Sequence, residues 1–160
     1  MKSSYWNETI YKFFLNSLSS CTYVSYTDKE LQDELDVLAM RAIARFKFPQ
    51  VPLTYDYDPQ LIEGEEVAKG YYFTNSGVGP REWDVIIAWM KVLWVEYQLS
   101  KERNYENLYA DKDVKAFSSG NLISSIEKSF TTIMDAARKI EENYYRVAVD
   151  GSPSIGEVNV

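Results

Sequence analysis

The sequence predicts a mainly α protein, a helical bundle with two long antiparallel helices, a small β-ribbon and an extended C-terminal tail. Three observations lead to this prediction. Apolar residues recur at helical spacing in four segments, one short segment alternates apolar and polar residues, and Gly, Ser and Pro gather near the C-terminus. The length of 160 residues suits one domain. We therefore expect a helical domain over 1–149, with the ribbon inserted near 51–74, and an extended arm over 150–160.

Two helices are predicted in the first part of the chain. The first covers about 4–19, where an apolar stripe includes Ile10. The second begins at a capping box formed by Thr27 and Glu30, in which each side chain satisfies a backbone N–H of the other residue. Acidic residues lie early in this helix and basic residues late, as the helix dipole favours, and Pro49 ends it.

The ribbon is predicted from a change of period. Residues 51–58 alternate apolar with other side chains, which is typical of a strand, and Pro52 favours an edge position. We expect a loop with acids and glycines over 59–70 and a short partner strand over 71–74.

Two long helices follow, over about 80–108 and 120–147, and we expect them to pair antiparallel. Pro80 suits the first position of a helix. The first half of the earlier helix is apolar most of the way round, which predicts burial on several sides, some of them facing another subunit. The later helix has a single apolar stripe.

Composition excludes several kinds of chemistry. The chain has no histidine, so Ser-His, Cys-His and His-liganded metal sites are excluded in cis. The single Cys21 excludes an internal disulfide and a Cys-based zinc site. A net charge of -7 argues against tight binding to nucleic acid or to an anionic membrane. With no secretory signal pattern and no bilayer-length apolar stretch, we expect a protein made in a reducing cytoplasm, without a membrane partner.

The ribbon segment carries acids that are candidate oxygen ligands for Mg²⁺ or Ca²⁺. These acids are Asp56, Asp58, Glu63, Glu65 and Glu66. Their spacing does not match an EF-hand loop, and we interpret them as a solvated acidic edge. We therefore expect no metal and no cofactor.

A second acidic group lies on the second helix, at Glu30, Asp33 and Asp36. All-helical nucleotide pyrophosphatases hold Mg²⁺ with carboxylates clustered on neighbouring helices. Here the acids lie opposite the apolar stripe, so we expect them to point to water. We expect no catalysis, and the alternative is a small Mg²⁺-dependent all-α enzyme that processes nucleotides.

The high content of Trp and Tyr favours a binding surface, because aromatic side chains bury much area at low entropic cost. A monomer core rich in aromatic residues is the competing interpretation. The aliphatic residues of the C-terminal arm suit an extended segment that binds a partner. The candidate partner-binding residues are Trp83, Trp89, Trp94, Tyr55, Tyr57, Tyr71, Ile155, Val158 and Val160.

About two thirds of the chain resembles a class of small helical virion proteins from the neck of tailed bacteriophages. Within that class, it is most similar to the first neck ring, or adaptor, of crAss-like phages. The resemblance lies in overall character and element order, not in a catalytic motif. The segments that carry it are FKFP (46–49), YYFTN (71–75), EWDVIIAWMKVLWVEYQLSKERNYENLY (82–109), DKDVKAFSSGN (111–121) and ARKIEENYYR (137–146).

The resemblance implies a structural head–tail connector that forms a ring, with twelve copies expected, below the portal. The arm over 150–160 would dock on the portal or a neighbour, the ribbon would be a second contact, and another face would meet the next neck or tail ring protein. DNA would pass through an acidic lumen without sequence-specific binding. The protein would be made in the host cytoplasm and reside in the neck of the virion. Another phage tail-completion protein or scaffold factor is an alternative.

Overall fold

The structure is a computed structural model that describes residues 5–18, 27–62, 65–109 and 119–150. The described part is mainly helical with a small two-stranded antiparallel sheet, which confirms the predicted fold class. Residues 151–160, which include most of the predicted arm, lie outside the described residues. The elements are η1 (Trp6–Glu8), α1 (Ile10–Ser17), α2 (Asp28–Arg45), β1 (Tyr55–Ile62), β2 (Glu65–Phe73), α3 (Pro80–Tyr109) and α4 (Ser119–Asp150).

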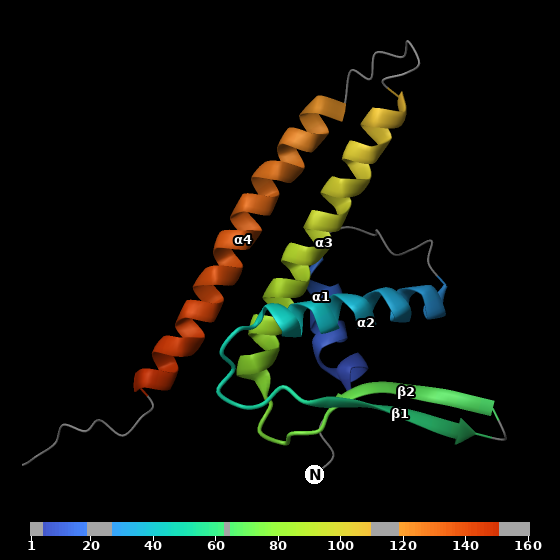
Figure 1. Cartoon of the computed structure of the whole chain (residues 1–160), viewed down its shortest axis with the longest axis vertical. Coiled ribbons are helices and arrows are strands. Elements are labelled where there is room, and N and C mark those ends of the chain that lie inside the picture. The colour runs from blue at the N-terminus through green and yellow to red at the C-terminus, as the bar shows by residue number, and fades with distance from the viewer. Residues whose placement is uncertain (1–4, 19–26, 63–64, 110–118, 151–160) are drawn as a thin grey trace, which may run out of the picture.

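Helix α3 is the centre of the fold. Figure 1 shows α4 beside it along much of its length, while α1 and α2 cross its N-terminal half. Every residue from Val85 to Met90 is buried, as expected for a helix covered on more than one side. On the α2 side, the Arg45 guanidinium lies 3.0 Å from the Glu96 carboxylate and over the ring of Trp89. The prediction that this helix is buried on several sides is confirmed.

Helices α3 and α4 form the predicted antiparallel pair. Tyr144, near the end of α4, donates its hydroxyl hydrogen bond to Glu82, in the first turn of α3. Further along the pair, the Trp89 indole N–H donates to Glu141. Because Glu82 and Trp89 are in ascending order while their partners are in descending order, the two helices run in opposite directions.

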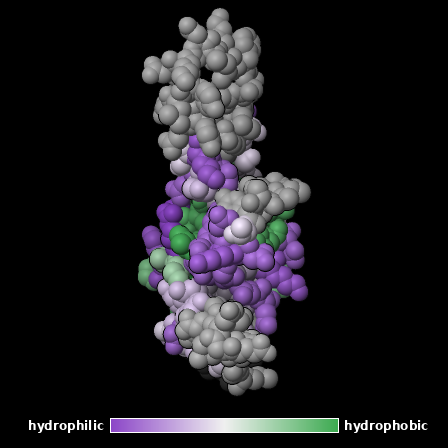
Figure 2. Space-filling view, turned by 90° about the vertical axis from the view of Figure 1, so that its right-hand side faces the viewer, coloured by the Kyte–Doolittle hydropathy of each residue, from purple (hydrophilic) through white to green (hydrophobic). Residues whose placement is uncertain are grey.

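Helix α2 begins at the predicted capping box. The Glu30 amide donates to the Thr27 hydroxyl over 3.3 Å, and the Thr27 amide donates to the Glu30 carboxylate over 2.9 Å. Asp28, Glu30 and Asp33 near this end are exposed. Figure 2 shows that the described surface on this side of the molecule is mainly hydrophilic. Two of the acids predicted to point to water, Glu30 and Asp33, therefore do so.

The predicted helix over 4–19 is shorter in the structure, because the chain first makes a 3-10 turn at Trp6–Glu8 and α1 begins only at Ile10. At the junction, the Thr9 hydroxyl donates to the Tyr5 carbonyl over 2.9 Å. The turn faces the ribbon, and Tyr5 forms an isolated bridge with Tyr72. The segment that the sequence predicts as one helix is therefore broken at the point where it contacts the ribbon.

The ribbon is longer than predicted. The prediction of a loop over 59–70 is wrong, because β1 continues to Ile62 and β2 starts at Glu65. The ladder shifts register between Asp58 and Pro59, where Asp58 pairs with Gly70 and Pro59 with Ala68. A bulge accommodates a proline that cannot donate to the ladder, and Gly70 adopts the positive φ of 92° that side-chain-bearing residues avoid. Pro59 and Gly70 therefore lie at an irregularity within the ribbon, and the two strands continue beyond them.

A cluster of aromatic rings holds the base of the ribbon on the helical body. Trp6 is fully buried, and its ring centre lies 5.0 Å from Tyr55, 5.1 Å from Tyr71, 5.4 Å from Phe73 and 6.1 Å from Tyr11. These rings come from both strands, η1 and α1. A two-stranded ribbon is marginal without something to pack on, and the Trp6 cluster supplies that packing.

We predict that Trp6→Ala destabilises the protein by about 3–5 kcal/mol, because it removes the ring at the centre of this cluster and leaves a cavity. Urea unfolding followed by circular dichroism measures the loss. Phe13→Ala is the matched control, since Phe13 is 51% exposed on α1 and its truncation should change stability by less than about 0.5 kcal/mol. Equal losses in the two variants would contradict the role given to Trp6.

Candidate interaction surfaces

The three ribbon tyrosines proposed as partner-binding residues lie together. Tyr71 is half-buried against Trp6, and the ring of Tyr57 meets its edge with centres 4.9 Å apart. Tyr55 contacts both Trp6 and Tyr71 and remains 38% exposed, while Tyr57 is 41% exposed. The base of the ribbon therefore presents two partly exposed tyrosines over a rigid aromatic layer, which is an arrangement suited to contact with a partner.

The three α3 tryptophans are more enclosed. Trp89 is 8% exposed, and its indole N–H donates to the Glu141 carboxylate over 3.1 Å, so its polar atom is used inside this chain. Trp83 and Trp94 are half-buried, and among the described residues neither indole nitrogen has a hydrogen-bond partner. The remaining candidates, Ile155, Val158 and Val160, lie outside the described residues.

A buried polar network, which sequence reasoning missed, joins α3, α4 and the α2–β1 connection. Glu82 is 6% exposed and accepts from the Gly79 amide and from the Tyr144 hydroxyl, each over 2.9 Å. The Gly79 contact is the acidic half of a capping box, with Pro80 at the first helical position as predicted. The spacing of Gly79 and Glu82 could have indicated the bond at the start of α3. It could not have indicated that Glu82 also accepts from Tyr144 on α4.

Tyr144 is the centre of this network. Its hydroxyl accepts from the Gln50 amide over 2.8 Å, its ring packs against Phe46, and the Arg81 guanidinium lies 5.1 Å from the ring centre. Burial is the main cause that raises the pKa of Tyr144, so the hydroxyl stays protonated and available to donate to Glu82. The network fixes the connection after α2 against the C-terminal part of α4.

A groove runs along one side of the α3–α4 pair. Its larger hollow has a volume of about 320 Å³, and a second hollow of about 220 Å³ adjoins it through Asp84 and Ile140. Ile140 lines both hollows and is 38% exposed there. The larger hollow is lined mainly by Asp84, Ile87, Lys91, Ile133, Ala137 and Ile140.

The acidic groups proposed as alternative metal ligands are dispersed. Among the described residues, no group of three or more Cys, Asp or Glu side chains is placed to hold a metal ion. The prediction that Asp36 points to water is wrong, because Asp36 is half-buried and accepts from the Tyr11 hydroxyl over 2.5 Å and from the Gln32 amide over 2.9 Å. Asp58 likewise accepts from the Tyr5 hydroxyl.

Comparison of the chain with family models, curated proteins and solved structures gave no match. None of the helices in the described part combines the length and apolar content needed to cross a bilayer.

We predict that Tyr144→Phe destabilises the protein by about 1–3 kcal/mol, because it leaves the buried Glu82 oxygen and the Gln50 amide without this partner. Tyr145→Phe is the matched control, since the Tyr145 hydroxyl bonds Glu141 at a less buried position. The control should lose about 0.5–1 kcal/mol in the same denaturant titration. A larger loss in the control would contradict the importance of the Glu82 network.

We also predict a pH dependence from Asp36. Burial raises its pKa above the ordinary value of 3.8, although the hydrogen bonds from Tyr11 and Gln32 oppose the shift. The folded state therefore takes up a proton before the unfolded state as the pH falls. In the window just above pH 3.8, the wild-type protein should gain stability relative to Asp36→Asn as the pH falls, and lose it as the pH rises.

Unfolding free energies of both proteins, measured across this window, check that prediction. The difference between the two proteins isolates Asp36 from the other titrating groups. Parallel pH profiles would contradict the prediction.

Proposed function

We propose that this protein is a structural component of a bacteriophage virion, a head–tail connector subunit in the neck that forms a ring between portal and tail. The observation that supports this most is the incomplete enclosure of the α3–α4 pair. Helix α4 has 32 residues and packs on α3, yet the groove between them remains open with Ile140 at its surface. An open apolar groove on a long helical pair is typical of a protein completed by assembly.

Two further features fit assembly. The ribbon projects sideways from the body (Figure 1) and presents Tyr55 and Tyr57 at its base, where a neighbour or another neck protein would bind. The segment after Asp150 is the proposed docking arm for the portal, with Ile155 and Val158 among its anchoring residues. The segments that resemble neck proteins include most of α3 and part of α4.

The acidic charge suits a ring through which DNA passes. With a net charge of -7 per chain, a ring of such subunits would repel the phosphate backbone and let DNA slide without adhering. The proposal includes synthesis in the host cytoplasm, about twelve copies per ring, and a next neck or tail ring protein on the other face. It assigns the protein no catalytic reaction.

We predict that the purified protein co-sediments with the portal ring of its phage and appears as an added ring by electron microscopy. Removal of residues 151–160 should weaken this binding and leave the helical content by circular dichroism unchanged, because α4 ends at Asp150. A protein that stays monomeric and unbound in the presence of portal would contradict the connector function. Unchanged binding by the truncated protein would contradict the arm assignment alone.

A further inference from the structure

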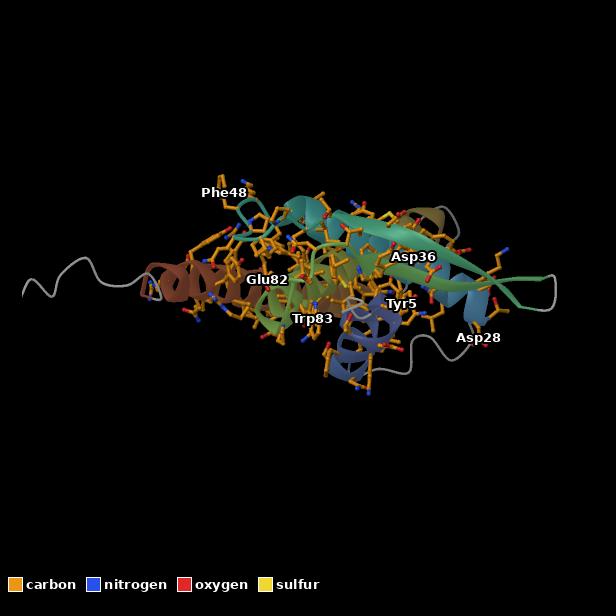
Figure 3. The ribbon with its side chains drawn as sticks, turned by 90° about the horizontal axis from the view of Figure 1, so that it is seen from below. Tyr5, Asp28, Asp36, Phe48, Glu82 and Trp83 are labelled. Carbon is orange, nitrogen blue, oxygen red and sulfur yellow. The ribbon has the colours of Figure 1, made fainter. Side chains whose placement is uncertain are left out.

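The connection between α2 and β1 presents an exposed aromatic side chain in a fixed position. Phe48 is 72% exposed, more than the other exposed large apolar residues of the described chain, and Figure 3 shows it at the edge of the molecule. The loop is held on both sides of it, by the buried Phe46 ring against Tyr144 and by the Gln50 amide on the Tyr144 hydroxyl. Pro49 restricts the backbone of Phe48 to extended conformations.

Such a residue has the properties of an interface anchor. A large aromatic ring on a preorganised loop loses little conformational entropy on binding and gains much buried area. Within its own chain, Phe48 contacts the Tyr145 ring only edge-on, with centres 6.5 Å apart. The Phe48 ring therefore stays exposed to water, and burial against a partner would be favourable in free energy.

The α3–α4 groove has room for an aromatic ring and has apolar walls. Its hollow of about 320 Å³ is larger than a phenylalanine side chain, and Ile87, Ile133 and Ile140 contribute apolar walls. The groove also runs on past Ile140 into the adjoining hollow, which leaves room for residues beside the ring.

The charges beside the two features are complementary. Lys47 precedes Phe48 and is exposed, and Asp84 lines both hollows of the groove. Among the described residues, the side chain of neither forms a hydrogen bond or an ion pair within its own chain. Partial burial raises the pKa of Asp84.

Two cations also line the groove. Lys91 lies two turns further along α3 in the larger hollow, and Arg81 lines the smaller one, where its guanidinium donates to the Tyr144 carbonyl over 3.1 Å. Asp84 is the residue with a negative charge that lines both hollows.

Phe48 and the larger hollow of the groove lie on opposite sides of α4. Phe48 packs beside Tyr145, whereas Ile140 and Ala136 line the groove. At about 100° per residue, Tyr145 is about 140° around the helix from Ile140 and about 180° from Ala136. The loop is held at Phe46 and Gln50, so the Phe48 of one chain does not reach the groove of the same chain.

From this geometry we propose that Phe48 of one copy inserts into the α3–α4 groove of a second copy, where Lys47 pairs with Asp84. The two contacting surfaces differ, so the contact is heterologous. A joined pair keeps one free groove, on the copy that inserts its ring, and one free Phe48, on the copy that receives it. Repetition of such a contact gives a ring if the rotation closes and a filament if it does not. The inference deepens the proposed function, on which its biological setting rests, by naming the surfaces that join neighbouring subunits.

The first experiment is sedimentation velocity of the full chain over a wide range of concentration. The wild-type protein should self-associate, and Phe48→Ala should weaken association by about tenfold or more. Phe13→Ala is the matched control, since it removes an equally large exposed ring from α1 and should leave association unchanged. Thermal melts check that each variant is folded.

A mixing experiment tests whether the contact is heterologous. Phe48→Ala keeps the groove but loses the inserting ring, and Ile140→Arg keeps the ring but obstructs the groove. Each variant alone should be monomeric, while an equimolar mixture should form a one-to-one dimer and nothing larger. A mixture that stays monomeric although both variants are folded would overturn the proposal.

A charge exchange tests the register. Lys47→Glu and Asp84→Lys should each weaken association, and the double variant should recover much of it, because the pair is restored with reversed signs. Failure of the double variant to recover would overturn the Lys47–Asp84 pairing. Wild-type protein that is monomeric at every concentration, or Phe48→Ala that associates like wild type, would overturn the inference as a whole.

These outcomes are separate from those of the connector function. Self-association that depends on Phe48, without binding to portal, would support the inference and contradict the connector function. Portal binding by Phe48→Ala, together with unchanged self-association, would do the reverse.

Discussion

Between Val85 and Val95, α3 presents buried side chains in several directions, and the free energy gained by removing them from water draws α1, α2 and α4 onto it. Each fully buried large side chain contributes about 1.5–3 kcal/mol, and fully buried residues such as Ile86 and Met90 together outweigh any single polar contact in the fold. The ribbon depends on the same centre, because α1 rests on α3 and carries Tyr11 into the Trp6 cluster.

Apolar burial is not directional, so polar contacts determine how the elements align on α3. Glu82 and Tyr144 fix the register of α4, and the Gln50 amide ties the connection after α2 to the same hydroxyl. That arrangement has a consequence for the surface, because the loop that is held so firmly carries the exposed Phe48. The buried network and the candidate subunit interface are therefore mechanically connected.

The aromatic residues divide into two populations. Trp6, Trp89 and Phe73 are enclosed and serve packing, while Tyr55 and Tyr57 keep part of their surface at the base of the ribbon. Both interpretations of the high aromatic content are thus present in one chain. The enclosed rings position the exposed ones, and the proposed assembly uses the groove, the loop and the ribbon that this core leaves at the surface.

Local patterns in the sequence predicted the four helices and the starts of α2 and α3. Thr27 and Glu30 predicted the start of α2, and Pro80 predicted the start of α3, because capping and backbone restriction act over a few residues. Contacts distant in sequence decided the rest: Asp36 is drawn from water by Tyr11, 25 residues away, and Gln50 meets Tyr144 across 94 residues. The ribbon extends through Pro59 because pairing across the bulge outweighs local turn preference. Only the tertiary structure shows that Phe48 remains exposed and that a groove opens beside Ile140, because burial depends on which surfaces the other elements leave uncovered.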